Sequence, residues 1–342
     1  MVVLLDWDGT LATLALFKSK GVLLVMEPSL GGDEAFVLSR RFGVSVATEL
    51  SSTATELSST ATSLLSVAMS SATSSIQTRK SLKSRLREGD NLYGLFLLSL
   101  SPEIAEIAAF SGYDFIIIDL EHGPGGIREA INCIRAIEAA GCSAVVRVPD
   151  VTQAWAKKAL DLGTAGIMFP MVENGGSASD AVSFCRYRPD GVRGCAYTVV
   201  RDSKFGFDEA YLANYIDDLL VMCQIESEEG VKNVNEIVAV DGMDCVMMGP
   251  RDLSASLGLL HDPGNPKVKS TMRTAETAVL ASDPVKGGAY LAGMATAQDM
   301  AADLWSRGYH IVLGSADVSL FKKAAVDDVK ANKKSVVAVS GV

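Results

Sequence analysis

Residues Phe115–Gly123 read FIIIDLEHG, an apolar run that ends in Asp119, Glu121 and His122. A short, unbroken run of aromatic and β-branched residues predicts a strand buried on both faces, as in a parallel sheet covered by helices. The run Cys245–Met248, which reads CVMM, has the same apolar character. We therefore predict a parallel α/β sheet with polar side chains at the carboxyl ends of its strands.

The same rhythm of short apolar runs and amphipathic stretches continues through residues 81–342. Helices are predicted over Pro102–Phe110 and Ile127–Ala140, the second ended by Gly141. The length is close to the roughly 250 residues of a (β/α)8 TIM barrel, which is the fold we predict. An open, doubly wound sheet has the same local pattern and is the alternative. The eight predicted strands are Leu92–Leu97, Phe115–Asp119, Ala144–Val148, Gly166–Phe169, Leu220–Glu226, Cys245–Met248, Ala289–Leu291 and His310–Leu313.

One connection, Val172–Leu219, is too long for a single crossover helix. It contains Pro189, Gly191 and Gly206, which interrupt helices. We predict a helix followed by an extended loop that lies over the mouth of the barrel.

Residues 1–80 have a different composition and are predicted to be a low-complexity N-terminal extension, flexible in large part. Residues 45–78 are rich in Ser, Thr, Ala and Leu, and the heptad ATELSST occurs twice in succession, at Ala47–Thr53 and Ala54–Thr60. A repeat with Ser and Thr at most positions supplies no coiled-coil seam. A linker that is flexible or weakly helical is the expected structure.

The N-terminal stretch Val2–Ala12 resembles the first motif of the haloacid-dehalogenase phosphatases, with Asp6 and Asp8 at the positions of the nucleophile and the general acid. The resemblance covers about eleven residues, and the linker leaves no room for the rest of that domain. An isolated strand is the simpler interpretation. A transit peptide is also disfavoured, since residues 1–80 contain seven acidic residues.

Composition excludes several classes of protein. The formal net charge is −10 and no long basic block occurs, so no nucleic-acid partner is expected. No apolar stretch approaches the roughly 18–20 residues that span a bilayer, so no membrane partner is expected either. The six cysteines form no CxxC pair, which is typical of a reduced protein. We predict a cytoplasmic location.

Two carboxylates are the best candidates for a metal site. Glu226 ends the fifth predicted strand and Asp252 follows the sixth, so their backbones are expected to lie roughly 5 Å apart. Carboxylates that close repel each other unless a cation or a shared proton intervenes. Oxygen ligands without Cys or His favour Mg²⁺ or Mn²⁺. The alternative is that Asp252 only caps a helix that starts at Leu253.

The remaining polar residues at the strand ends suggest catalytic roles. His122, beside Asp119 and Glu121, is a candidate general acid or base, or else a loop histidine that makes ordinary hydrogen bonds. Arg147 requires an anion, which could be a developing enolate or an ordinary ion-pair partner. The turn Gly249–Ser254 exposes backbone amides that would suit a substrate carboxylate.

Taken together, these segments resemble the HpcH/HpaI aldolase family, metal-dependent pyruvate aldolases related to the citrate lyase β subunit. The resemblance runs from about Leu92 to Ala325. It rests on ordered motifs: Gly112–Phe115, Asp119–Gly123, Val146–Pro149, Leu160–Gly163, Pro189–Gly194, Gln224–Glu226 and Gly249–Ser254.

The resemblance implies a role for each site residue. Glu226 and Asp252 would bind the divalent metal, Mg²⁺ or Mn²⁺, and Arg147 would stabilise the enolate. His122, oriented by Asp119 or by Asp161 (from the same or a neighbouring subunit), would move the proton of the aldol hydroxyl. The implied substrate-binding residues are Arg147, Ser203, Gly249, Pro250, Arg251 and Asp252.

The resemblance also implies a homo-oligomer, commonly a hexamer, in which the C-terminal helix at about Ser319–Val329 is exchanged between subunits. Two features depart from the family. Many relatives carry a small residue where Arg251 stands, and the N-terminal extension has no recognised counterpart.

The expected function is that of a carbon–carbon lyase that forms or cleaves 4-hydroxy-2-oxo acids through a metal-bound pyruvate enolate. Oxaloacetate decarboxylation is expected as a second activity. The partners would be a small 2-oxo acid and an aldehyde or other electrophile. The alternatives are a macrophomate synthase-like enzyme that adds the enolate to a 2-pyrone, and a non-catalytic barrel subunit.

Overall fold

The computed structural model describes residues 80–262, 264–297 and 299–339, with side chains up to residue 333, and four short strands near the N-terminus. The chain divides into two units, Met1–Thr78 and Arg79–Val342. The first unit contains two hairpins, β1 (Val2–Trp7) with β2 (Thr10–Ala15) and β3 (Phe17–Ser19) with β4 (Val22–Leu24). The predicted linker at 45–78 lies outside the described residues.

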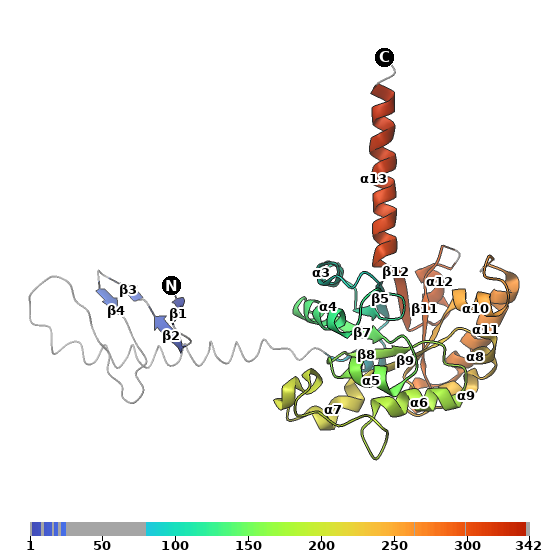
Figure 1. Ribbon diagram of the computed structural model, residues 1–342, viewed down its shortest axis with the longest axis horizontal. Coiled ribbons are helices and arrows are strands. Elements are labelled where there is room, and N and C mark those ends of the chain that lie inside the picture. Colours follow the sequence, from blue (N-terminus) through green and yellow to red (C-terminus); the bar gives the residue numbers. More distant parts are fainter. Residues whose placement is uncertain are drawn as a thin grey trace, which may run out of the picture. The chain divides into compact units, whose positions relative to one another are not determined.

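The second unit contains a closed barrel of eight parallel strands (Figure 1). The last strand pairs with the first, as in the register of Ile311 with Leu92, so the open doubly wound sheet is excluded. The prediction of a TIM-type α/β barrel is therefore confirmed. The strands are β5 (Leu92–Leu97), β6 (Phe115–Asp119), β7 (Ser143–Arg147), β8 (Gly166–Phe169), β9 (Leu220–Ile225), β10 (Cys245–Met248), β11 (Tyr290–Met294) and β12 (Ile311–Ala316).

Helices surround the barrel (Figure 1). Local sequence explains their limits: Ser101 caps α3 by accepting from the amide of Ile104, and Pro102 occupies the first turn. The helices are α2 (Leu82–Arg87), α3 (Pro102–Phe110), α4 (Ile127–Ala139), α5 (Gln153–Leu160), α6 (Gly175–Cys185), α7 (Tyr211–Asp218), α8 (Glu228–Lys232), α9 (Val234–Val238), α10 (Pro250–Ser256), α11 (Pro266–Ala281), α12 (Ala301–Ser306) and α13 (Asp317–Val339), with 3-10 turns η1 (Arg201–Gly206) and η2 (Pro284–Lys286).

The core has two layers because side chains alternate between the two faces of each strand. Ile116 and Ile118 of β6 pack outward against the helices. Phe115 and Ile117 belong to the inner cluster, which Leu82 of α2 joins. The next residue of the inner row of β6 is Asp119. The same alternation that buries the apolar core therefore directs the last inner residue of a strand toward the carboxyl end of the barrel lumen.

The connection from Val172 to Leu219 differs from its prediction. It begins with α6, which returns the chain to the amino ends of the strands, and residues 186–219 stay there. Lys83 of α2 donates to the carbonyl of Ile216, and Arg201 donates to the carbonyl of Leu162 just before β8. The prediction of a loop over the mouth of the barrel, at the carboxyl ends of the strands, is wrong. The long loop comes after helix α6 and therefore starts at the amino ends of the strands.

His310 gives a pH-dependent contribution to stability. Its Nδ1 accepts the amide of Leu291 at 3.1 Å, and burial lowers its pKa from the ordinary 6.5. The unfolded chain therefore binds more protons than the folded chain as the pH falls below about 6.5, and stability is lost in that direction. We expect His310→Asn, which keeps an acceptor that does not titrate, to reduce the loss of Tm between pH 7.5 and pH 5 by about 2 °C.

The exposed His261 provides the control for this measurement. Its replacement by Asn should leave the pH dependence of Tm unchanged. An identical pH dependence in wild type and His310→Asn would show that His310 makes no such contribution.

Candidate active site

An ion-paired arginine is the centre of the carboxyl end of the barrel. Asp119 and Arg147 end β6 and β7 and are direct neighbours in the sheet register. Both project into the lumen, and Asp119 is fully buried. Arg147 donates from Nε to Asp119 Oδ1 at 3.0 Å and from Nη2 to Oδ2 at 2.6 Å. This two-point pairing fixes the plane of the guanidinium group.

Two more groups hold the third nitrogen of this guanidinium. Nη1 of Arg147 lies 2.8 Å from Glu121 Oε2 and donates to Gln224 Oε1 at 3.3 Å. The ring of Phe96 lies against the guanidinium, with its centroid 4.8 Å from the Arg147 Cζ. Arginine has five N–H donors, and three of them make hydrogen bonds here, to the two Asp119 oxygens and to Gln224. Glu121 Oε2 lies close to Nη1 as an ion-pair partner but does not have the geometry of a hydrogen bond. One N–H of Nη2 and one of Nη1 therefore have no acceptor among the described residues.

Glu226, directly after β9, is held by hydrogen bonds on both oxygens. Oε1 accepts from Gln224 Nε2 at 3.0 Å, and Oε2 accepts from the amide of Met171 at 3.1 Å. Met171 has a φ of 49°, in the left-handed region that few residues other than glycine adopt. Strain of this kind persists where the surroundings require it, here in the turn that directs an amide at Glu226.

Glu226 and Asp252 lie at the same end of the barrel. Ile225 and Met248, the residues at which their strands end, are paired in the register of β9 and β10. The pKa of Glu226 is raised to about 7, chiefly by burial and also by the charges of Asp252 and Glu121, while the Met171 amide and Arg147 act to lower it. Among the described residues, no group of three or more His, Cys, Asp or Glu side chains forms a metal cluster.

The structure rejects one alternative for Asp252. Helix α10 begins at Pro250 and its N-cap is Gly249, so Asp252 is the third residue of the helix and does not cap it. Gly249 lies beside the Glu226 carboxylate, because a Cβ at Gly249 would come within 2.5 Å of Oε1. Glycine is therefore required for Glu226 to occupy this place. Arg251 is exposed at the same turn.

His122 lies at the rim of this site. Its side chain is 60% exposed, and its Nε2 is 3.9 Å from Glu121 Oε1. Asp119 accepts the backbone amide of His122 at 3.2 Å, so its carboxylate orients the turn while its main ion pair is with Arg147. The carboxylate nearest the ring is therefore Glu121. Neither His261, which is exposed, nor His310 contributes to the site.

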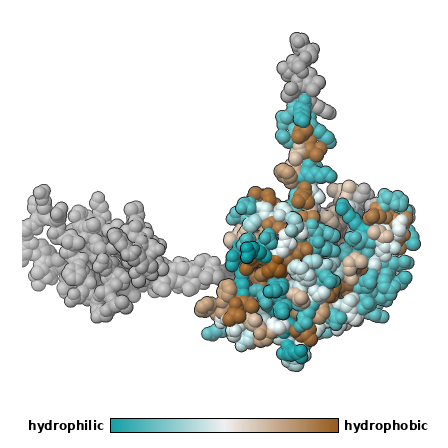
Figure 2. Space-filling view, in the orientation of Figure 1, coloured by the Kyte–Doolittle hydropathy of each residue, from teal (hydrophilic) through white to brown (hydrophobic). Residues whose placement is uncertain are grey.

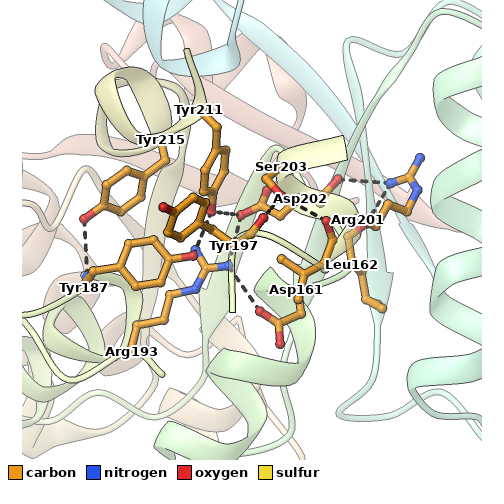
Figure 3. Close-up of polar contacts among 12 residues, drawn as sticks. Asp161, Leu162, Tyr187, Arg193, Tyr197, Arg201, Asp202, Ser203, Tyr211 and Tyr215 are labelled. Atoms are coloured by element: carbon orange, nitrogen blue, oxygen red, sulfur yellow. Dashed lines mark hydrogen bonds and ion pairs between the residues drawn. The ribbon is translucent and has the colours of Figure 1, made fainter. Parts of the chain in front are cut away.

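Asp161 and Ser203 lie at the opposite end of the barrel. Asp161 ends α5 and lies 3.4 Å from Arg193, which also pairs with Asp202 at 3.0 Å (Figure 3). The hydroxyl of Tyr211 donates to Asp202 in the same cluster. Ser203 is buried and donates to the carbonyl of Val200 at 3.1 Å. Within one chain, neither Asp161 nor Ser203 reaches Arg147 or Glu226.

Gln224 and Glu121 belong to the site but were not among the predicted site residues, although Glu121 was named as a carboxylate beside His122. Gln224 stands two residues before Glu226, so the period of a strand places both in the lumen. The two-residue spacing from Glu226 would therefore have been enough to predict Gln224 as a residue of the site. Glu121 lies in a turn, where no period applies, and the contact of the Met171 amide with Glu226 has no signal in the sequence.

The family model of the HpcH/HpaI aldolase/citrate lyase family matches residues 92–324. The chain belongs to this family. The 2-keto-3-deoxy-L-rhamnonate aldolase of Escherichia coli is 36% identical over 242 residues, which cover 71% of this chain and 89% of the relative. As a member of the HpcH/HpaI family, the chain is an enzyme of the lyase class, an aldolase.

Solved structures support the same assignment. An HpcH/HpaI family protein from Burkholderia cenocepacia has 37% identity and a TM-score of 0.68, covering 74% of this chain and 98% of that one. Macrophomate synthase has 26% identity and a TM-score of 0.63, covering 75% and 91%. The matched part of this HpcH/HpaI chain is the barrel.

Proposed function

We propose that this aldolase cleaves and forms 4-hydroxy-2-oxo acids through the enolate of pyruvate, and that it requires a divalent cation, Mg²⁺ or Mn²⁺. Decarboxylation of oxaloacetate, which yields the same enolate, is proposed as a second activity. The observation that carries the proposal is the immobilised guanidinium of Arg147, which keeps N–H donors that no described residue accepts and is linked through Gln224 to the buried carboxylate of Glu226.

The donor groups at the strand ends fit a hard cation. Each oxygen of Glu226 accepts one hydrogen bond and so retains a lone pair for a ligand. Asp252 and Glu226 repel each other electrostatically, and a cation between them would remove that cost. We propose Glu226 and Asp252 as its protein ligands, with water and substrate at the other positions. When bound, the cation would polarise the 2-oxo group of the substrate.

The other side chains have complementary roles in cleavage. His122 would accept the proton of the 4-hydroxyl group, so that the oxygen electrons form the aldehyde carbonyl while the C3–C4 bond breaks. The electrons of that bond become the C2–C3 double bond of the enolate, whose charged oxygen would accept a hydrogen bond from a free N–H of Arg147. Protonation of C3 then gives pyruvate. Asp119 would hold Arg147 in place.

The turn after β10 is proposed to bind the substrate carboxylate. Gly249 and Pro250 bring the first turn of α10 beside Glu226, and the amides of Arg251 and Asp252 lie in that turn. First-turn amides have no acceptor within their own helix and are therefore free to bind an anion. The exposed Arg251 adds a positive charge at the rim, which would favour an acceptor with an anionic group.

The proposal is tested by a substrate panel. Purified protein, stripped of metal with a chelator, is assayed for pyruvate release from 4-hydroxy-2-oxo acids and from oxaloacetate, with and without added Mg²⁺ or Mn²⁺. We expect activity only with metal. A 2-pyrone is the alternative acceptor that the resemblance of the sequence implies, so the products formed from oxaloacetate with a 2-pyrone and with an aldehyde are compared. Pyruvate release that is equal with and without metal would contradict the metal requirement.

Gly249 allows a test of the site that leaves every charged group in place. A methyl group at this position would displace the Glu226 carboxylate, because its Cβ would lie 2.5 Å from Oε1. We expect Gly249→Ala to lower aldol cleavage by about 100-fold, the effect of misplacing a catalytic group by about 1 Å. The control is Gly264→Ala, where the nearest atom would be 3.9 Å away. Wild-type activity in Gly249→Ala would show that the active site does not depend on the position of the Glu226 carboxylate.

We also propose a homo-oligomer, of the hexameric kind implied by the family resemblance. Helix α13 begins directly after β12 and projects away from the barrel (Figure 1). Apolar residues lie among polar ones on the part of this helix that Figure 2 colours by hydropathy. Phe321 is 75% exposed, and Ile107 and Phe110 of α3 are exposed on the barrel. In a (β/α)8 barrel the last helix packs beside the first, so α13 of another subunit would cover these residues of α3.

Substitution of one residue on α13 tests the oligomer. We expect Phe321→Asp to shift the protein toward the monomer in light scattering, because the charge would be buried against another subunit. Lys323→Asp, an exposed position on the same helix, is the control. A wild-type protein that is already monomeric would overturn the proposed oligomer.

A cytoplasmic location is proposed on the basis of the cysteines. Cys133, Cys142, Cys185, Cys223 and Cys245 are buried as free thiols, and Cys195 is exposed and free. Free thiols are typical of a reducing compartment. In the part of the chain that the structure describes, no helix has the length and apolar character of a membrane span.

A further inference from the structure

Glu121 connects two groups of the proposed active site that otherwise have no contact with each other. Its Oε2 lies 2.8 Å from Nη1 of Arg147, and its Oε1 lies 3.9 Å from Nε2 of His122. We propose that Glu121 is a positioning residue, which fixes His122 relative to the enolate held at Arg147. This inference rests on the proposed function.

The burial of Glu121 makes it suitable for this role. Its side chain is 19% exposed, against 60% for His122. Arg147 anchors one oxygen of Glu121, and Arg147 is itself fixed by Asp119. An anchored carboxylate next to an exposed imidazole restricts the rotamers of the ring, whereas a free glutamate would lose entropy on forming the contact.

Among the described residues, Glu121 is the carboxylate within ion-pair distance of the His122 ring. Both Asp119 oxygens bind Arg147, and Asp119 Oδ1 also accepts the amides of Glu121 and His122. Asp161 is at the other end of the barrel. The 3.9 Å between His122 and Glu121 exceeds a hydrogen bond, but catalytic contacts of this kind commonly shorten when substrate binds.

The two reactions of the proposed function need Glu121 to different extents. Aldol cleavage requires a base for the 4-hydroxyl proton, which is the role of His122. Decarboxylation of oxaloacetate breaks a bond to a carboxylate that leaves as CO₂ and has no hydroxyl proton to remove. A residue that acts through His122 should therefore affect cleavage far more than decarboxylation.

The experiment compares the kinetics of both reactions in the full-length protein. In Glu121→Gln, the neutral amide can accept from Arg147 or from His122 but presents a donor to the other. We expect kcat for cleavage to fall by at least about 10-fold, within the range for general acid–base catalysis, with KM changed by less than about 3-fold. Decarboxylation should fall by less than about 3-fold. Glu138→Gln, which removes an exposed arginine pair far from the site, is the control.

A double-mutant cycle decides whether Glu121 acts through His122. In a His122→Ala background, Glu121→Gln should have no further effect on cleavage, since the residue it positions is absent. Additive losses would overturn the proposal. So would equal losses in both reactions, or unchanged cleavage in Glu121→Gln.

A measurement that needs no activity separates this inference from the proposed function. The chain has three histidines, so the His122 ring signal can be assigned by NMR from the His122→Ala variant. We expect Glu121→Gln to shift that signal and increase the mobility of the ring. If wild type cleaves no 2-oxo acid but the His122 signal responds, the function is wrong and the contact is right. An unchanged signal shows that the contact is absent.

Discussion

Glu226→Gln is expected to abolish metal-dependent release of pyruvate, with a loss of at least about 1,000-fold. The variant removes one of the two charges that would bind the cation. It also places an amide N–H against either the Gln224 amide or the Met171 backbone amide, both of which donate to Glu226. Two donors that face each other cost the hydrogen bond and leave a buried polar group unpaired. Asp252→Asn should show the same loss of activity.

Two measurements separate loss of the metal from loss of the fold. Calorimetry with Mn²⁺ should show tight binding in wild type and none in Glu226→Gln, while the Tm of the metal-free proteins stays within a few degrees. Glu228→Gln, two residues along at the exposed start of α8, is the matched control and should bind metal normally. Full activity in both Glu226→Gln and Asp252→Asn would contradict the proposal that these two residues bind a catalytic metal ion.

Arg147→Ala is expected to have the second large effect, on the chemical step and on stability together. Loss of a donor to a developing oxyanion costs about 100- to 1,000-fold in kcat. Asp119 is fully buried, and in this variant its charge would have no partner. Breaking a buried ion pair in this way typically costs about 3–5 kcal/mol.

Arg147→Lys separates the two effects. A lysine keeps the charge near Asp119 and should retain more of the stability, but it cannot pair with both Asp119 oxygens and still direct an N–H at the substrate. We expect kcat to fall by at least about 100-fold with a smaller loss of stability than in Arg147→Ala. Arg201→Lys, at the surface pair with Glu138, is the control. An unchanged turnover number in Arg147→Lys would show that Arg147 has a structural role and none in catalysis.

The amino-acid sequence was sufficient for most of the fold. Strands β5, β6, β8 and β10 have their predicted bounds. Strand β9 differs by one residue at one end, and β7, β11 and β12 differ by one to three residues at both ends. Helix α3 has its predicted limits because Ser101 and Pro102 define its start. These are local effects, because an apolar run, a capping residue or a helix breaker determines the conformation of residues close to it in the sequence. The number of strands and the length of the chain favoured a closed barrel, but only the pairing of β12 with β5 excluded the open sheet.

The sequence also placed Arg147, Glu226 and Asp252 at one end of the barrel. This followed from their positions after apolar runs, because parallel strands end at the same edge. The sequence did not reveal the partners of these groups. Arg147 pairs with Asp119 and Glu121, and Gln224 joins Arg147 to Glu226. A strained turn at Met171 holds Glu226. Contacts of this kind depend on side-chain rotamers and on the twist that brings strands together around the lumen.

The positions of Asp161, Ser203 and the segment 186–219 were decided by the tertiary structure alone. A motif in the right order along the chain says nothing about the end of the barrel at which it lies, because each helix carries the chain back by the length of a strand. The sequence by itself determined which residues form strands and which polar groups close them. Only the packed barrel decided which of those groups touch, because contact between residues distant in sequence is a property of the closed sheet and not of any segment.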